Sequence, residues 1–142
     1  MPDVDEAIVL KTLNDFAAAY SAGDAEAVMA LISHDPDSVL VGTGADEVRI
    51  GPEQIREQVE RDMGQAERIE MQMGDVQVSG RGNVAWALAE PVVIATVGEE
   101  HIRMPTRLTV TLVNDDGTWL IHAGHLSVAF AEQQPGESFA NA

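Results

Sequence analysis

The chain has 142 residues, 45% of them hydrophobic, so it is long enough to bury the core of one domain. Its formal net charge is -16 at pH 7, with 24 acidic residues against 8 lysines and arginines, so we expect it to bind neither nucleic acid nor an anionic membrane surface. The lack of cysteine excludes disulfides, thiol nucleophiles and thiolate metal sites.

The N-terminal stretch does not resemble a signal peptide, in which a basic start precedes a long apolar core. No run approaches the roughly 18 apolar residues that a membrane-spanning helix needs. From these two features we expect a cytoplasmic protein.

Two helices are predicted at the start of the chain. The first, capped by Asp3 or Asp5, runs to about Ala22, because its apolar residues recur at steps of three and four along one face. Gly23 suits the left-handed position that follows a helix. Asp24 then caps a short second helix over residues 25–32.

A short strand over residues 38–42, a loop and a second short strand over residues 47–50 come next. Pro52 suits the first position of a third helix, where no amide partner is needed, and this helix runs to about residue 65. Asp62 is among the residues on its predicted buried side.

Four extended runs separated by short turns follow, so neighbouring runs are expected to be antiparallel. Pro91 marks a bend in the second run. The NDDG turn between the last two runs favours a hairpin, since Asn, Asp and Gly tolerate positive φ angles. The runs cover about residues 68–79, 83–97, 100–113 and 118–129. Helices followed by antiparallel strands indicate an α+β fold, in which a curved four-stranded sheet can wrap the helices around a cavity.

Four short motifs carry a resemblance to a known family. They are AYSAGD at residues 19–24, GPEQI at 51–55, NVAW at 83–86, and the last strand, WLIHAGHLS at 119–127. In order and spacing they resemble the NTF2-like superfamily, and within it the SnoaL-like group.

The resemblance implies an NTF2-like cone of three N-terminal helices packed on a curved antiparallel sheet. It implies a single domain over residues 1–130, followed by a tail over residues 131–142 that we expect to be loose. It also implies a homodimer formed through the sheet face, a cavity for a small apolar molecule, and no cofactor. This fold hosts enzymes of several kinds as well as plain binding domains, so the resemblance leaves the activity open.

Ketosteroid isomerases on this fold provide one specific comparison. The resemblance would place their catalytic tyrosine near Phe16 and their catalytic aspartate near Val41 or Gly42, and none of these residues has the required group. That activity is therefore not expected. Tyr20, one helical turn further on, is a candidate substitute, and the alternative is a core aromatic residue.

The last strand contains the leading catalytic candidate. Alternation puts Trp119, Ile121, Ala123, His125 and Ser127 on one face, which by the resemblance lines the cavity. His125 is the candidate acid or base, because an imidazole titrates near neutral pH. The alternative is a core histidine held by hydrogen bonds.

Charged residues on the other runs are weaker candidates. Glu90 interrupts an apolar run and is either a general base or the structural partner of a cation such as Arg107. Arg107 either points into the cavity or lies on a solvated strand face. Asp46 and Glu47, on a loop near the expected cavity mouth, are interpreted as solvated.

The candidate pocket and functions follow from these assignments. His125, Glu90 and Tyr20 are the catalytic candidates. No metal site is predicted, because His122 and His125 are three apart on a strand and face opposite sides. Two functions stay open: a module that binds a small, largely apolar molecule, which we favour slightly, and a cofactor-free isomerase, cyclase or dehydratase that uses His125 as acid or base. The pocket residues are Phe16, Tyr20, Val41, Trp86, Glu90, Arg107, Trp119, Ile121, His125 and Ser127.

Overall fold

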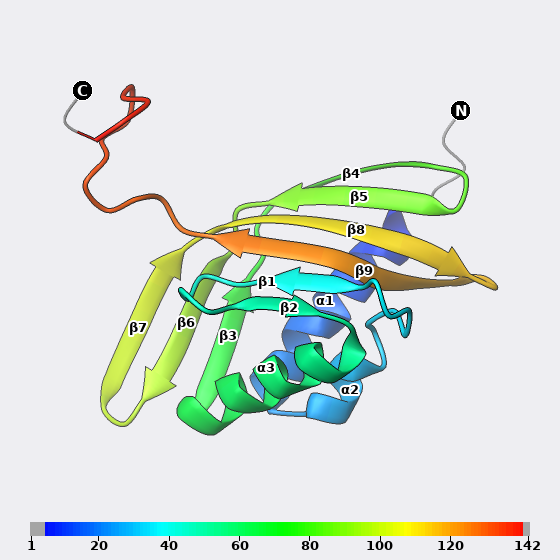
Figure 1. Cartoon of the computed structure of the whole chain (residues 1–142), viewed down its shortest axis with the longest axis horizontal. Coiled ribbons are helices and arrows are strands. Elements are labelled where there is room, and N and C mark those ends of the chain that lie inside the picture. The colour runs from blue at the N-terminus through cyan, green and yellow to red at the C-terminus, as the bar shows by residue number, and fades with distance from the viewer. Residues whose placement is uncertain (1–4, 141–142) are drawn as a thin grey trace.

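Three helices lie against the concave side of a curved sheet in the computed structural model, which describes residues 5–140 (Figure 1). This arrangement confirms the predicted α+β fold class. The helices are α1 (Glu6–Ala22), α2 (Ala25–Met29) and α3 (Pro52–Gln65). The strands are β1 (Val39–Val41), β2 (Val48–Ile50), β3 (Arg68–Gln72), β4 (Val76–Arg81), β5 (Val84–Ala89), β6 (Val92–Val97), β7 (Glu100–Pro105), β8 (Arg107–Asp115) and β9 (Thr118–Ser127).

The predicted helix ends are largely found. Asp5 caps α1 by accepting a hydrogen bond from the Ala7 amide at 3.0 Å, and the other candidate cap, Asp3, lies outside the described residues. Gly23 ends α1 with a left-handed φ of 68°. The second helix is shorter than predicted, because the chain after it pairs with β9 through an isolated bridge between Ile32 and Ile121.

The strands form two sheets rather than the single four-stranded sheet that the pattern suggested. One sheet has six strands in the order β2-β1-β9-β8-β5-β4, and the other has three in the order β3-β6-β7. All neighbours are antiparallel except β1 and β9, which run parallel. Each of the first three predicted runs is therefore two strands.

The chain crosses between the two sheets at a bend held by Pro91 and Thr106. Both residues are buried, and Pro91 separates β5 from β6 as the sequence predicted. The Thr106 hydroxyl donates a hydrogen bond to the Pro91 carbonyl at 2.6 Å, and the Thr106 amide donates to the same oxygen at 3.0 Å. This contact fixes the angle between the two sheets.

Replacing Thr106 with valine keeps the side-chain shape and removes the hydroxyl donor. We expect the Thr106→Val protein to lose about 1 kcal/mol of unfolding free energy, the usual net value of one buried hydrogen bond. Urea unfolding measures the loss. Thr118→Val, at an exposed position at the start of β9, is the control and should change stability less. Equal effects at the two positions would show that the bend does not depend on this bond.

A β-bulge in β9 changes which side chains face inward. Thr111 pairs with Ala123 but Leu112 pairs with Ile121, so His122 is an extra residue in β9. The strand alternation shifts by one at this point. Trp119 and Ile121 face the helices, whereas the three later residues predicted to share their face lie on the opposite face of the sheet: Ala123, His125 and Ser127.

Candidate functional site

A cavity of about 330 Å³ lies between the helices and the inner faces of the two sheets. Most of its wall is apolar and comes from α1, β1 and both sheets. Its polar lining residues come from α1, α3 and the loop between β1 and β2. These polar residues are Tyr20, Thr43, Glu47, Gln58, Asp62 and Gln65.

Tyr20 and Asp62 form the best-defined polar pair in this cavity. The Tyr20 hydroxyl, on α1, donates a hydrogen bond to Oδ2 of Asp62, on α3, at 3.1 Å. Only 5% of Tyr20 is exposed. Burial, together with the nearby Asp62 carboxylate, raises the pKa of Tyr20 far above its ordinary value, so this hydroxyl stays protonated and serves as a donor.

Gln58 holds the other oxygen of Asp62. The Arg49 Nε donates to Gln58 Oε1 at 3.0 Å, and Gln58 Nε2 donates to Asp62 Oδ1 at 2.7 Å. Because arginine can only donate, it orients the Gln58 amide, whose NH₂ group then points at Asp62. Asp62 therefore accepts one hydrogen bond on each oxygen.

The environment of Asp62 favours proton uptake. Burial raises the pKa of this carboxyl, and this effect exceeds the lowering by the hydrogen bonds from Gln58 and Tyr20. A carboxyl group in an apolar cavity with a raised pKa is suited both to anchor a polar ligand group and to exchange a proton with it.

Four of the predicted pocket residues are among those that line the cavity. Phe16 and Tyr20 lie one turn apart on α1, with their ring centroids 5.1 Å apart. Val41, at the end of β1, and Ile121, on β9, also border the cavity. The sequence therefore located the α1 wall of the cavity correctly.

Five predicted pocket residues are not among the cavity-lining residues of the described chain, and these predictions are wrong. Trp86 is 45% exposed on the outer face of β5, because Ala85 and Ala87 take the inner face. Glu90 is exposed between β5 and β6. Arg107 is also exposed and donates to the Ser127 Oγ at 3.2 Å. Trp119 is buried in the core.

His125 borders the cavity only from the far side of its strand. It pairs with Val41 and Thr109, whereas its inward-facing neighbour Gly124 packs beside Leu40. Its side chain is exposed on the outer face of the sheet. The bulge at His122 turns the His125 side chain to this face, and the role of His125 as acid or base stays a prediction.

Two acidic residues of the site were missed as functional candidates. The sequence predicts Asp62 on the buried side of its helix. A carboxylate on a buried face indicates a possible functional residue, and this was the signal that could have identified Asp62. Glu47 was interpreted as a solvated loop acid, but its side chain is only 18% exposed and lines the cavity. No local pattern signals a role for Glu47, because its burial depends on how the loop folds back.

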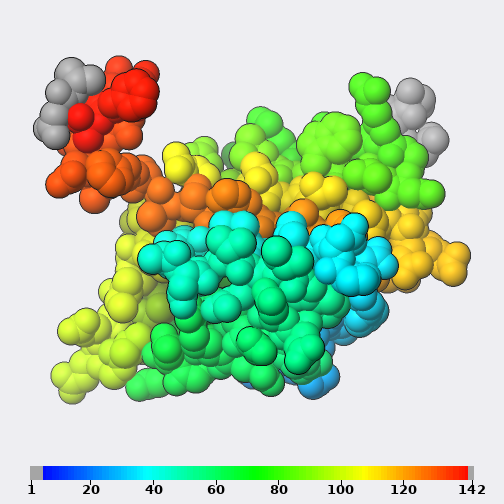
Figure 2. All heavy atoms as spheres, in the orientation of Figure 1, coloured from blue at the N-terminus to red at the C-terminus, as the bar shows by residue number. Residues whose placement is uncertain are grey.

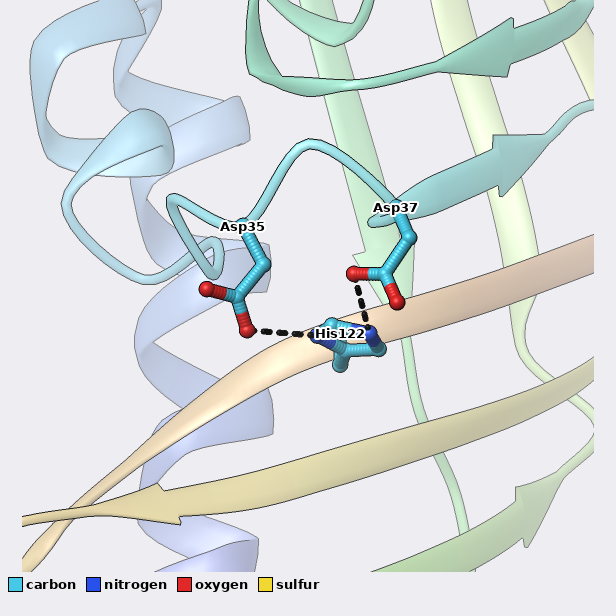
Figure 3. A group of neighbouring side chains, drawn as sticks. All are labelled: Asp35, Asp37 and His122. Atoms are coloured by element: carbon cyan, nitrogen blue, oxygen red, sulfur yellow. Dashed lines mark ion pairs between the residues drawn. The ribbon is translucent and has the colours of Figure 1, made fainter.

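A separate cluster lies outside the cavity (Figure 3). His122 sits between two aspartates, with Nε2 3.2 Å from Asp37 Oδ1 and Nδ1 3.9 Å from Asp35 Oδ2, and Ser33 Oγ lies 3.0 Å from Nδ1. Asp35, Asp37 and His122 offer ligand atoms within 4.8 Å of one another, a group that could hold a metal ion. As the side chains lie, however, the two carboxylates contact different nitrogens of the His122 ring. These contacts link the loop before β1 to β9.

The fold and the cavity define an α+β cone protein with a partly open, largely apolar cavity. The chain belongs to the family of the SnoaL-like domain, whose sequence profile matches residues 9–131. This confirms the predicted NTF2-like, SnoaL-like relationship. The predicted end of the domain at residue 130 stays a prediction, although residues 131–140 form turns without helix or strand.

Solved structures support the same relationship. A proposed dehydratase of the NTF2-like family from Streptomyces avermitilis is 21% identical, with a TM-score of 0.83 over 92% of this chain and 100% of that one. A proposed aromatic ring hydroxylase from Novosphingobium aromaticivorans is 16% identical, with a TM-score of 0.81 over 92% of each chain. An NTF2-like superfamily protein from Salmonella enterica is 17% identical, with a TM-score of 0.80 over 92% of this chain and 94% of that one.

At these identities the likeness establishes the fold and not the reaction. Among curated proteins, no sequence matches this chain. Within residues 5–140, no helix is long and apolar enough to cross a membrane.

Proposed function

We propose that the cavity binds a small, largely apolar molecule whose polar group lies against Tyr20 and Asp62. The observation that carries this proposal is the hydrogen bond between Tyr20 and Asp62 at the polar end of a largely apolar cavity. A few fixed polar groups in an apolar cavity orient a ligand, while the apolar wall supplies most of the binding free energy. A volume of about 330 Å³ corresponds to about eleven water-sized groups. Compact cage alcohols such as adamantanol have that size.

Filling the cavity should abolish binding. Ala95, on β6, lines the cavity, and Ala95→Phe places a ring in the space that the ligand needs. Isothermal titration with adamantanol should show at least about tenfold weaker binding to this variant. Ala18→Phe, at an exposed position on α1, is the control and should bind as wild type does. Wild-type binding by Ala95→Phe would contradict the proposal.

Acid–base catalysis is the second candidate, and the raised pKa of Asp62 in an apolar cavity favours it. Asp62 takes a proton from the carbon beside a carbonyl, and that proton leaves with a β-hydroxyl as water. The likeness to a protein named as a proposed dehydratase agrees with this class of reaction. Cyclic β-hydroxyketones test it, because water loss gives an ultraviolet-absorbing enone. Turnover that persists in Asp62→Asn would rule out this role.

We also propose that the outer sheet face forms a homodimer. Two rows of residues cross all six strands of the larger sheet, and none of these twelve positions holds a charged residue. With 23% of the chain charged, about three would be expected. Trp86 and Leu88, each 45% exposed, are the largest side chains of these rows. The rows are Ser79, Trp86, Thr111, Ala123, Val39, Ile50 and Gln77, Leu88, Thr109, His125, Val41, Val48.

The dimer makes a direct prediction for Trp86. A carboxylate on this face meets its own copy near the two-fold axis, so Trp86→Glu should run as a monomer in light scattering where the wild type runs as a dimer. Val97→Glu, at an exposed position on β6 outside the two rows, is the control and should keep the wild-type mass. A monomeric wild type, or a dimeric Trp86→Glu, would contradict the proposed interface.

A further inference from the structure

Two acids lie at the polar end of the cavity. Asp62 and Glu47 both line it, whereas neither lysine nor arginine is among the lining residues in the described part of the chain. The nearest guanidinium groups are turned to other partners. Arg49 donates to Gln58 at 3.0 Å, and Arg61 pairs with Asp46 at 2.9 Å.

The loop between β1 and β2 builds Glu47 into this position. The Gly42 amide donates to the Glu47 carbonyl at 2.9 Å, which folds the loop back on itself. A Cβ on Gly42 or Gly44 would collide with the Glu47 carboxylate, so a side chain at either position would push this carboxylate aside. Arg61 Nη2 approaches this carboxylate only to 3.7 Å, which leaves its oxygens available on the cavity side.

The hydrogen bonds fix what the cavity offers to a ligand. The Tyr20 proton is directed at Asp62, so the Tyr20 oxygen faces the cavity with lone pairs only. Both Asp62 oxygens accept, and an ionised carboxylate has no proton to give. Glu47 adds a second acceptor group with negative charge. A ligand group that contacts Tyr20, Asp62 and Glu47 must therefore supply the hydrogen.

From this arrangement we infer that the cavity selects ligands with a hydrogen-bond donor, a hydroxyl or an amine, and rejects carboxylates and other anions. This inference rests on the proposed binding function and adds the chemical class of the ligand. An anionic ligand beside Asp62 and Glu47 would bring three like charges together at low dielectric. An ammonium group on the ligand would instead donate charged hydrogen bonds to the carboxylates of Asp62 and Glu47.

Three ligands with one apolar cage test the selection: adamantylamine, adamantanol and adamantane carboxylate. Isothermal titration at pH 7 and fixed ionic strength should give the amine the tightest binding and the carboxylate an affinity at least about tenfold below that of the alcohol. If none of the three binds, the proposed function itself fails. If all bind equally, or the carboxylate binds best, the cavity still binds small apolar molecules but the inferred selection is wrong.

Removing one acid separates selection from general binding. Glu47→Gln should weaken binding of the amine more than binding of the alcohol, and so lower the preference for amine over alcohol by about two- to fivefold. Glu60→Gln, on the exposed side of α3, removes a charge outside the cavity and should leave the preference unchanged. An unchanged preference in Glu47→Gln would overturn the role of Glu47. Circular dichroism checks the fold of both variants, and should Glu47→Gln not fold, the order of the three ligands on the wild type decides.

Discussion

Replacing Asp62 with asparagine is expected to weaken binding of adamantylamine roughly 10- to 100-fold, because it removes a charged hydrogen-bond acceptor worth about 1.5–3 kcal/mol. Isothermal titration measures the change. The exposed control Glu60→Gln carries the same loss of charge on the same helix and should bind as wild type does. Equal affinities for the wild type and Asp62→Asn would place the ligand elsewhere.

The same substitution has an effect on stability with a definite sign. The pKa of Asp62 is raised above its ordinary value of 3.8, so the folded state holds this proton more tightly than the unfolded chain does. The contribution of Asp62 to stability is therefore present below that ordinary value and is lost as pH rises through the raised pKa. Asp62→Asn should gain stability relative to wild type over this interval. Urea unfolding at a series of pH values checks the difference, and a gain confined to acidic pH would contradict the assignment.

The second large effect concerns the core beneath the bulge. Leu112, on β8, has 0% exposure and pairs with Ile121 just beyond the extra residue of β9. Leu112→Ala should lower the unfolding free energy by about 2–5 kcal/mol, through lost apolar contact and the cavity left behind. Urea unfolding gives the value.

The matched control for Leu112 is an exposed strand residue. Ile102 is 44% exposed on β7, and Ile102→Ala should cost clearly less than Leu112→Ala. Equal losses would mean that the packing against β9 is looser than the fold implies.

The fold was predictable because several independent signals agree with it. An aspartate cap, a glycine stop and apolar spacing located α1, and Pro52 located the start of α3, each to within a few residues. The NDDG turn does adopt positive φ, at Asp116 (51°) and Gly117 (90°). The division into two sheets was not predictable from alternation alone. Only the break at Pro91 is visible in the sequence, and the break at Thr106 depends on a contact 15 residues away.

The candidate site was predictable only in part. Alternation assigns the faces of a strand correctly until a bulge adds a residue, and the bulge at His122 moved His125 to the outer face. Asp62 reaches Tyr20 across 42 residues of sequence, a contact that local patterns cannot reveal. What the sequence did offer was a carboxylate on the buried face of a helix, a feature that is costly without a partner and therefore informative.

The C-terminal residues belong neither to the cavity lining nor to the two rows of the proposed dimer interface. Residues 128–140 extend away from the body of the molecule at one corner (Figure 2). Phe130 and Phe139 are 60% and 76% exposed there. Nothing in the proposed binding function depends on this segment.

The central claim is that the ligand enters the cavity, and methyl NMR of the methionines tests it most directly. Met71, Met73 and Met104 line the cavity, whereas Met29 and Met63 are not among its lining residues. On titration with adamantanol, the methyl signals of the first three should shift together while those of Met29 and Met63 stay in place. Shifts confined to Met29 and Met63, or binding without any shift of the three cavity methyls, would contradict the proposed site.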